Sequence, residues 1–194
     1  IVTTERHHPP MMIQRCLRRK CENVKSQYLN RFFSTRGARY LDDDESLDSI
    51  LEKIVLKKAY ERDRETSTLC EVLVNRKQTL RAVRSISRHC DSDMFRDMLH
   101  TRRVLAIGMY REGNPKTAIK LVSTRNAVGA NALIYEMAKD PKNQEEDSIV
   151  QDLLDSMLFT NTCTYNGLIR HARHSFNQAN KRFEEMLEKG LVPN

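Results

Sequence analysis

Apolar side chains recur at intervals of three and four residues along most of the chain from Leu47 onward. This spacing places them on one face of a helix, and it predicts amphipathic α-helices in residues 46–63, 66–89 and 93–113. No stretch alternates between apolar and polar residues for long enough to predict a β-strand. The pattern therefore predicts an all-α fold.

Short turns separate the predicted helices. Gly113 is typical of the turn after a helix, and Asn114 and Pro115 are typical of the cap and first turn of the next one. Helices of moderate length joined by short turns favour stacked hairpins, because one hairpin cannot bury its own apolar face. We therefore expect helix–turn–helix repeats stacked as an α-solenoid and preceded by a flexible N-terminal leader.

The last 33 residues, 162–194, carry the most specific motif, TCTYNGLIRHARHSFNQANKRFEEMLEKGLVPN. Its TYNGLI start, its FEEM segment and its GLVPN end fall at the separations found in the pentatricopeptide repeat, which this segment strongly resembles. That family's unit is a helix–turn–helix of about 35 residues, related in shape to other helical-hairpin repeats. The usual Ala–Gly turn is replaced by HARHSFNQ, which leaves the boundary between the two helices open. The matching residues are Tyr165, Asn166, Leu168, Ile169, Ala179, Phe183, Glu185, Met186, Gly190, Pro193 and Asn194.

The preceding residues, 127–161, resemble a degenerate repeat of the same family. The segment VGANALI matches the start of a first helix, but the Gly and Pro of the closing turn are absent. We expect residues 99–126 to form a further degenerate helical repeat and residues 42–98 a helical N-terminal region. Because apolar residues at the end of the last unit have no capping segment after them, we expect the chain to be the front part of a longer array.

Pentatricopeptide repeats bind single-stranded RNA with one base per repeat, so the resemblance implies an RNA-binding site. The amide of asparagine offers both a donor and an acceptor to the edge of a base. In the family's code, a pair of asparagines implies a preference for pyrimidines. The alternatives are that the asparagines are helix caps or turn residues and that the two stacking residues are ordinary packing residues. The positions that the resemblance assigns to RNA are Asn166 with Asn194, Asn131 with Asn161, and Cys163 and Val128 as the stacking residues.

The net charge of +7 comes from one segment near the N-terminus. Residues 11–40 hold eight basic residues and one acidic residue, whereas residues 41–194 have no net charge. The overall charge is therefore not evidence for RNA binding by the helical body. A basic, acid-poor amphipathic segment is typical of a transit peptide, and we predict a leader in residues 1–41. A basic surface helix of the mature protein is the alternative.

The segment RFFST, residues 31–35, resembles a mitochondrial processing site. We therefore expect localisation to the mitochondrion, with the chloroplast as the alternative. The chain starts with isoleucine and has two methionines at positions 11 and 12. We expect translation to begin at one of these methionines, which makes residues 1–10 a non-native leader.

Other chemistry has weak signals. The five cysteines form no CxxC pair and are expected to be reduced thiols. His171 and His174 have no third metal ligand near them in the sequence, so we expect surface histidines. No apolar run is long enough to span a bilayer. We find no nucleophile–base arrangement, and we expect a protein without cofactor or catalytic activity, although a catalytic domain could follow residue 194.

Two functions agree with these observations. The first is an RNA-binding adaptor that acts in organellar RNA stability, processing, editing or translation. The alternative is a helical-repeat scaffold that binds proteins, for instance a component associated with the mitochondrial ribosome. The expected partners are single-stranded organellar RNA and other organellar RNA-processing or ribosomal proteins.

Overall fold

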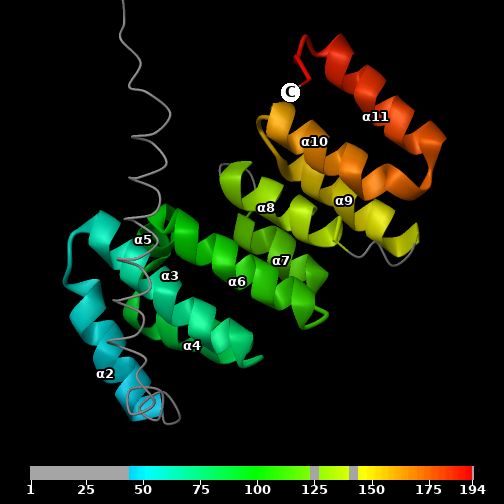
Figure 1. The fold of residues 1–194 in the computed structure, drawn as a ribbon. Helices are drawn as coiled ribbons and strands as arrows, with labels where there is room; N and C mark the ends of the chain where they lie inside the picture. The colour runs from blue at the N-terminus through cyan, green and yellow to red at the C-terminus, as the bar shows by residue number, and fades with distance from the viewer. Residues whose placement is uncertain (1–43, 123–126, 140–143, 194) are drawn as a thin grey trace, which may run out of the picture. The chain divides into compact units, whose positions relative to one another are not determined.

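The computed structural model describes residues 44–122, 127–139 and 144–193. Every regular element within these residues is a helix (Figure 1), which confirms the predicted all-α class. The chain divides into two compact units, residues 1–47 and 48–194, and the packing described below lies within the second. The predicted leader, residues 1–41, lies outside the described residues.

The helices of the described residues are of moderate length. Their bounds are α2 (Asp44–Val55), α3 (Ala59–Asn75), α4 (Thr79–His89), α5 (Ser92–Asp97), α6 (Leu99–Arg111), α7 (Pro115–Val122), α8 (Ala127–Met137), α9 (Gln144–Ser156), α10 (Thr162–His171) and α11 (Phe176–Glu188), with a 3-10 helix at Ala172–His174.

Consecutive helices pair into hairpins. Helix α3 contacts α4, α6 contacts α7, α8 contacts α9, and α10 contacts α11. The first helix of each pair also contacts the first helix of the next, in the order α3, α6, α8 and α10 (Figure 1). Helices α6, α8 and α10 begin at the residues where the sequence predicts new repeats. This serial packing places the core between successive hairpins, where Leu105, Leu133 and Ile134 are fully buried.

The single helix predicted for residues 46–63 is wrong, because the chain leaves α2 at Val55 and begins α3 at Ala59. Lys58 has an extended backbone (ψ 148°) immediately before α3. Arg62 donates through Nη1 to the Val55 carbonyl oxygen at 3.2 Å. That bond satisfies one of the carbonyl groups left without a partner at the end of α2, so the break is stabilised from the next helix.

The helix predicted for residues 66–89 is also two helices. Lys77 takes the left-handed conformation (φ 58°) between α3 and α4. The Gln78 N–H donates to the Leu73 carbonyl at 2.8 Å, which closes the last turn of α3. The Glu112 carboxylate then accepts the Thr79 N–H at 3.0 Å and caps the start of α4. Glu112 is distant in sequence, so the apolar periodicity could not reveal this break.

The glycine and proline signals are confirmed. Gly113 (φ 80°) and Gly190 (φ 69°) both take the left-handed conformation after a helix, where a residue without a side chain is favoured. Pro115 begins α7, where its missing N–H costs no hydrogen bond. These local signals were readable because they depend on backbone conformation rather than on distant contacts.

Buried polar side chains also join the helices. The buried Asp63 carboxylate, on α3, accepts the backbone N–H groups of His100 at 3.0 Å and Thr101 at 2.9 Å. It therefore caps the N-terminus of α6, and the single helix predicted for residues 93–113 is wrong because the chain breaks at Met98, between α5 and α6. Arg102 is also buried, and it donates to the carbonyl of Leu121 at 2.7 Å and to that of Arg96 at 3.0 Å. Burial lowers the pKa of the Arg102 guanidinium.

Candidate nucleic-acid interface

Helices α8 and α10 run parallel to each other and in register. Near their N-termini the Thr164 hydroxyl donates to the Asn131 amide oxygen at 2.7 Å. In the middle, Gly167 lies so close to Ile134 that a Cβ atom would come within 2.9 Å of its Cγ2. At their C-terminal ends the Arg173 guanidinium donates to the Lys139 carbonyl at 3.3 Å. Each contact joins residues 33 or 34 positions apart, so corresponding ends of the two helices are neighbours.

Asn161 is the N-cap of α10. Its side-chain oxygen accepts the Thr164 N–H at 3.0 Å, while the Thr164 hydroxyl accepts the Asn161 N–H at 3.1 Å. This reciprocal arrangement is a capping box, and it holds Asn161 in an extended conformation (φ −139°, ψ 179°). The cap interpretation of this asparagine is therefore correct, and it fixes the position of the amide at the end of the helix.

The structure brings Asn131 and Asn161 together. The Asn131 side chain donates through Nδ2 to the Asn161 side-chain oxygen at 3.3 Å. That oxygen also accepts the Thr164 N–H, so both of its lone pairs are used. The Nδ2 group of Asn161 takes no part in these contacts, and the Asn161 side chain is exposed. What Asn161 offers to a ligand is therefore its two N–H donors.

The two predicted stacking residues lie beside this amide pair. Val128 and Cys163 are the second residues of α8 and α10, and the parallel register places the ends of these helices next to each other. Val128 is 62% exposed, and Cys163 is also exposed. Ordinary packing does not explain either side chain at this position, since little of it is covered.

The second predicted asparagine pair is described only in part. Asn166 lies on α10 and is half-buried. Asn194 lies outside the described residues, so this pair stays a prediction.

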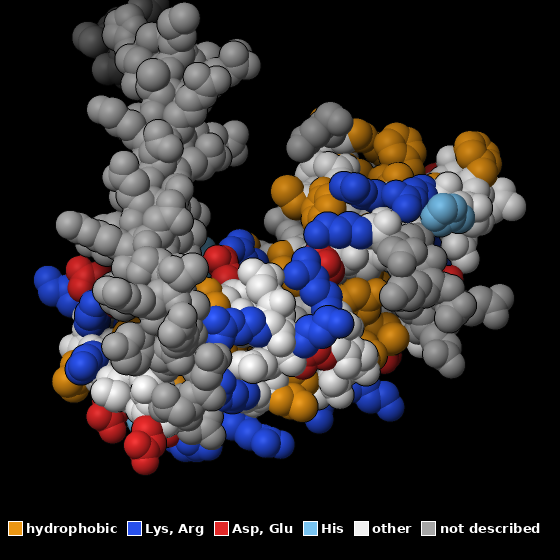
Figure 2. Space-filling model, turned by 60° about the horizontal axis from the view of Figure 1, so that its bottom comes forward, with side chains coloured by type: hydrophobic (Ala, Val, Ile, Leu, Met, Phe, Trp, Pro, Cys, Tyr) orange, Lys and Arg blue, Asp and Glu red, His pale blue; other side chains and the backbone are white. Residues whose placement is uncertain are grey.

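Basic residues lie at the C-terminal ends of α6, α8 and α10. Arg111, at the end of α6, binds Glu136 through Nε at 2.8 Å, and Lys139, just after α8, binds the other oxygen of Glu136 at 2.5 Å. Burial alone raises the pKa of the Glu136 carboxyl, but its hydrogen bonds with Arg111 and Lys139 outweigh burial and lower it. Arg173 extends this line to the end of α10. Lysine and arginine side chains are prominent on the face shown in Figure 2. We call Arg111, Lys139 and Arg173 the basic edge.

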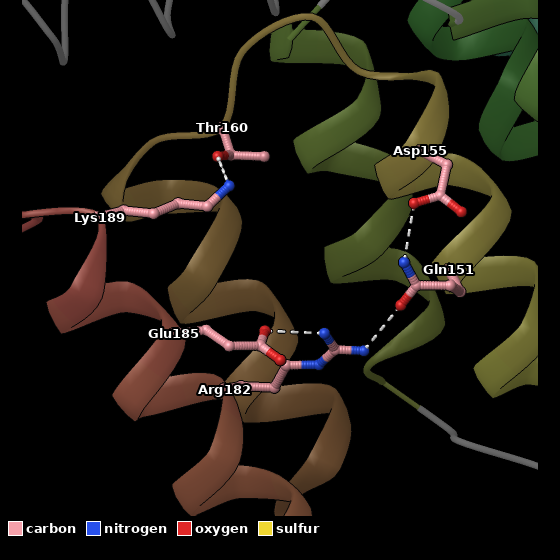
Figure 3. A network of polar contacts seen from close by, with 6 residues as sticks. All are labelled: Gln151, Asp155, Thr160, Arg182, Glu185 and Lys189. Atoms are coloured by element: carbon pink, nitrogen blue, oxygen red, sulfur yellow. Dashed lines mark hydrogen bonds and ion pairs between the residues drawn. The ribbon is translucent and has the colours of Figure 1, made fainter.

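A cleft of about 350 Å³ lies among α9, α10 and α11. Figure 3 shows its polar contacts: Arg182 bridges Gln151 at 3.2 Å and Glu185 at 2.9 Å, and Lys189 donates to Thr160 at 3.3 Å. The Lys189 ammonium also lies 5.7 Å from the centre of the Tyr165 ring. Arg182 of α11 binds Gln151 of α9, and Lys189 binds Thr160 in the loop after α9. The polar groups of the cleft are therefore best explained as contacts that join α9 to α11.

His171 and His174 differ in their burial. His171 is buried, with Nδ1 at 3.7 Å from the Asp147 carboxylate, so the prediction of a surface histidine is wrong at this position. His174 is exposed as predicted. Among the described residues, no three His, Cys, Asp or Glu side chains gather in a way that suits a metal ion. Of the five cysteines, Cys70, Cys90 and Cys163 are free thiols, and the other two lie outside the described residues.

Some features of this interface were not predicted. The sequence did not single out the basic edge or Thr164, although Thr164, Lys139 and Arg173 follow from placing residues 127–139 and 162–174 in the same register. Within the described residues, no helix is both long and apolar enough to cross a bilayer. In comparisons with known proteins, the chain matches no family model, no curated protein and no solved structure.

Proposed function

We propose that this chain binds single-stranded RNA through the N-terminal ends of α8 and α10, as a protein of the pentatricopeptide-repeat type. In this proposal the helix pairs stack as an α-solenoid, and α8 and α10 are the first helices of two successive repeats. The observation that carries the proposal is the contact between Asn131 and Asn161 at 3.3 Å, with the exposed Val128 and Cys163 beside it. Together these residues provide polar groups for the edge of a base and apolar surface for its face.

The N–H donors of Asn161 are compatible with pyrimidines as ligands. Its side-chain oxygen is occupied, so it presents N–H donors to a ligand. Cytosine and uracil carry carbonyl oxygens on their pairing edges, and these oxygens accept such donors. This agrees with the pyrimidine preference that the sequence resemblance implies.

The basic edge lies at the C-terminal ends of α6, α8 and α10, away from the asparagine pair, so it favours a polyanionic ligand only through its longer-range electrostatic field. Arg111, Lys139 and Arg173 come from three successive hairpins, and within the described residues the Glu136 carboxylate neutralises part of this charge. The remaining positive charge attracts a phosphate backbone. Binding of this kind weakens as the salt concentration rises, because the release of counterions into a more concentrated salt solution gains less free energy.

We further propose that the protein acts as a non-catalytic adaptor for organellar RNA in the mitochondrion, with the chloroplast as the alternative. The transit-peptide character of residues 11–41 supports this proposal. Import of a fluorescent fusion of residues 1–45, compared with a fusion in which the arginines of residues 11–40 are replaced by glutamine, measures it directly.

A protein-binding scaffold is the second candidate, and one observation favours it. Helix α11 leaves Phe176, Phe183 and Leu187 exposed to solvent. Exposed apolar residues that share a helix are typical of an interaction surface. The experiment below therefore includes a measurement that separates the two candidates.

The test is the affinity of the protein for a labelled oligocytidine, measured by fluorescence anisotropy at low and high salt. We expect binding that weakens as salt rises, and weaker binding for Asn161→Ser. Serine is as good an N-cap as asparagine, so this change keeps α10 capped while it removes the amide. The loss of one or two hydrogen bonds corresponds to binding weaker by about twofold to tenfold.

Asn180→Ser is the matched control, because Asn180 is an exposed asparagine on α11 that binds only Glu184 in the described contacts. It should bind RNA as tightly as the unchanged protein. Equal losses in both variants, or no RNA binding at low salt, contradict the proposal. In the second case, association with a protein partner that Phe183→Ser and Leu187→Ser abolish favours the scaffold.

A further inference from the structure

Phe159 is a large aromatic side chain in the loop between α9 and α10, and it is 76% exposed. An exposed aromatic ring offers a flat apolar face on which another ring can stack. Phe159 is also only two residues before Asn161, which belongs to the proposed RNA-binding site. The resemblance to the pentatricopeptide repeat assigns no role to this position.

Phe159 and Asn161 flank Thr160 in the loop that leads into α10. Asn161 has an extended backbone immediately before that helix. Thr160, between the two, points toward α11, where its hydroxyl accepts a hydrogen bond from Lys189 at 3.3 Å (Figure 3). Asn161 contacts Asn131 of α8, so the exposed Phe159 ring belongs to a residue two positions from the amide pair.

We propose that Phe159 is a stacking platform for an unpaired base of single-stranded RNA, next to the base that the Asn131–Asn161 pair contacts. This inference rests on the proposed RNA-binding function. Every base has a flat π face, so stacking on Phe159 adds affinity without adding sequence preference. The hydrogen bonds of Thr160 and Asn161 hold the two residues that follow Phe159. Little conformational freedom of this part of the loop is therefore lost when a base stacks.

The first measurement is the affinity of Phe159→Ala for oligocytidine, oligouridine and oligoadenosine. We expect binding weaker by between about fivefold and about a hundredfold for all three, as is typical when an aromatic platform for one base is removed. Phe159→Tyr, which keeps a stacking ring, should bind as the unchanged protein does. Because the side chain is exposed, the melting temperature should not change in either variant.

The second measurement uses a reporter. The chain contains no tryptophan, so Phe159→Trp introduces a single tryptophan whose emission is quenched when a base stacks on it. Phe176→Trp is the matched control, because Phe176 is similarly exposed, at 83%, but lies at the start of α11 after the turn at the other end of α10. We expect single-stranded RNA to quench the first tryptophan and not the second.

The outcomes separate this inference from the function on which it rests. If RNA binds and Asn161→Ser weakens it, but Phe159→Ala has no effect and the tryptophan at position 159 is not quenched, the stacking role is overturned and the RNA-binding function stands. Equal quenching at positions 159 and 176 also overturns it, since this indicates nonspecific contact. If the unchanged protein does not bind RNA at low salt, both proposals fail.

Discussion

Two side chains at corresponding positions bind the first turn of the next helix in the series. Asp63 is the fifth residue of α3 and binds Thr101, the third residue of α6. Asn131 is the fifth residue of α8 and accepts from Thr164, the third residue of α10. The first N–H groups of a helix lack partners within the helix. Asp63 supplies such partners from the neighbouring helix, whereas Asn131 binds a hydroxyl, and both side chains fix the register between hairpins.

Asp63 allows a test at the scale of one residue. We expect Asp63→Ala to lower the free energy of unfolding by about 2–3 kcal/mol, because the N–H of the buried Thr101 is then left without an acceptor and that of His100 also loses its partner. Urea denaturation followed by circular dichroism measures this change. Asp93→Ala is the control, since its carboxylate is exposed and makes a surface ion pair with Arg96. A similar loss in both variants would argue against the capping role.

The same residue scale bears on the RNA-binding proposal. In α3 the fifth residue is a buried carboxylate that is fully used by α6, so it cannot contact a base. In α8 the fifth residue is half-buried and keeps its contact with the exposed Asn161. We therefore expect no base recognition by the fifth residue of α3, in contrast to that of α8.

At the scale of the elements, the turns between paired helices differ in how well their residues suit them. Gly113 and Gly190 take the left-handed conformation at no steric cost, but Lys77 takes it with a side chain (φ 58°). The turn is held because the Gln78 N–H bonds to the Leu73 carbonyl and because Glu112 caps α4. Long-range contacts thus impose on Lys77 a conformation that its own backbone preference disfavours.

This strain gives a prediction for the turn between α3 and α4. We expect Lys77→Gly to raise the free energy of unfolding by about 0.5–1 kcal/mol, because relief of the left-handed strain exceeds the extra entropy of glycine in the unfolded chain. The midpoint of thermal unfolding should rise accordingly. Lys116→Gly, in the first turn of α7, should lower it, because glycine is a poor helix former. A lower midpoint for Lys77→Gly would contradict this account of the turn.

At the scale of the whole described unit, ion pairs between hairpins make its stability depend on pH. Glu136 joins α8 to Arg111 at the end of α6, and its pKa lies below its ordinary value of 4.5. A carboxylate with a lowered pKa in the folded state stabilises it fully above the unfolded-state pKa. This contribution is lost as pH falls through the folded-state pKa. Asp48, which binds Arg88 and His89, also has a lowered pKa and acts in the same direction.

We therefore expect the free energy of unfolding to fall when the solution is acidified below the ordinary pKa of Glu136. Denaturant titrations at neutral pH and at a pH below 4.5 measure this fall. In Glu136→Gln the difference between the two conditions should be smaller, because the substituted side chain does not titrate. Glu184→Gln, at an exposed position on α11, should leave the difference unchanged. An unaltered pH dependence in Glu136→Gln contradicts the proposed coupling of α6 and α8.

The sequence by itself determined the helical class, the turns at Gly113 and Gly190, the start of α7 at Pro115, and the cap at Asn161 as an alternative to its role in binding. These features depend on apolar periodicity and on backbone conformation, which neighbouring residues decide. Only the tertiary structure decided the breaks at residues 56–58 and 76–78, the burial of His171, and the contact between Asn131 and Asn161. Each of these depends on a partner in another helix, such as Arg62, Glu112 or Thr164. Periodicity within one helix carries no information about such partners, because it records which face is covered and not which side chain covers it.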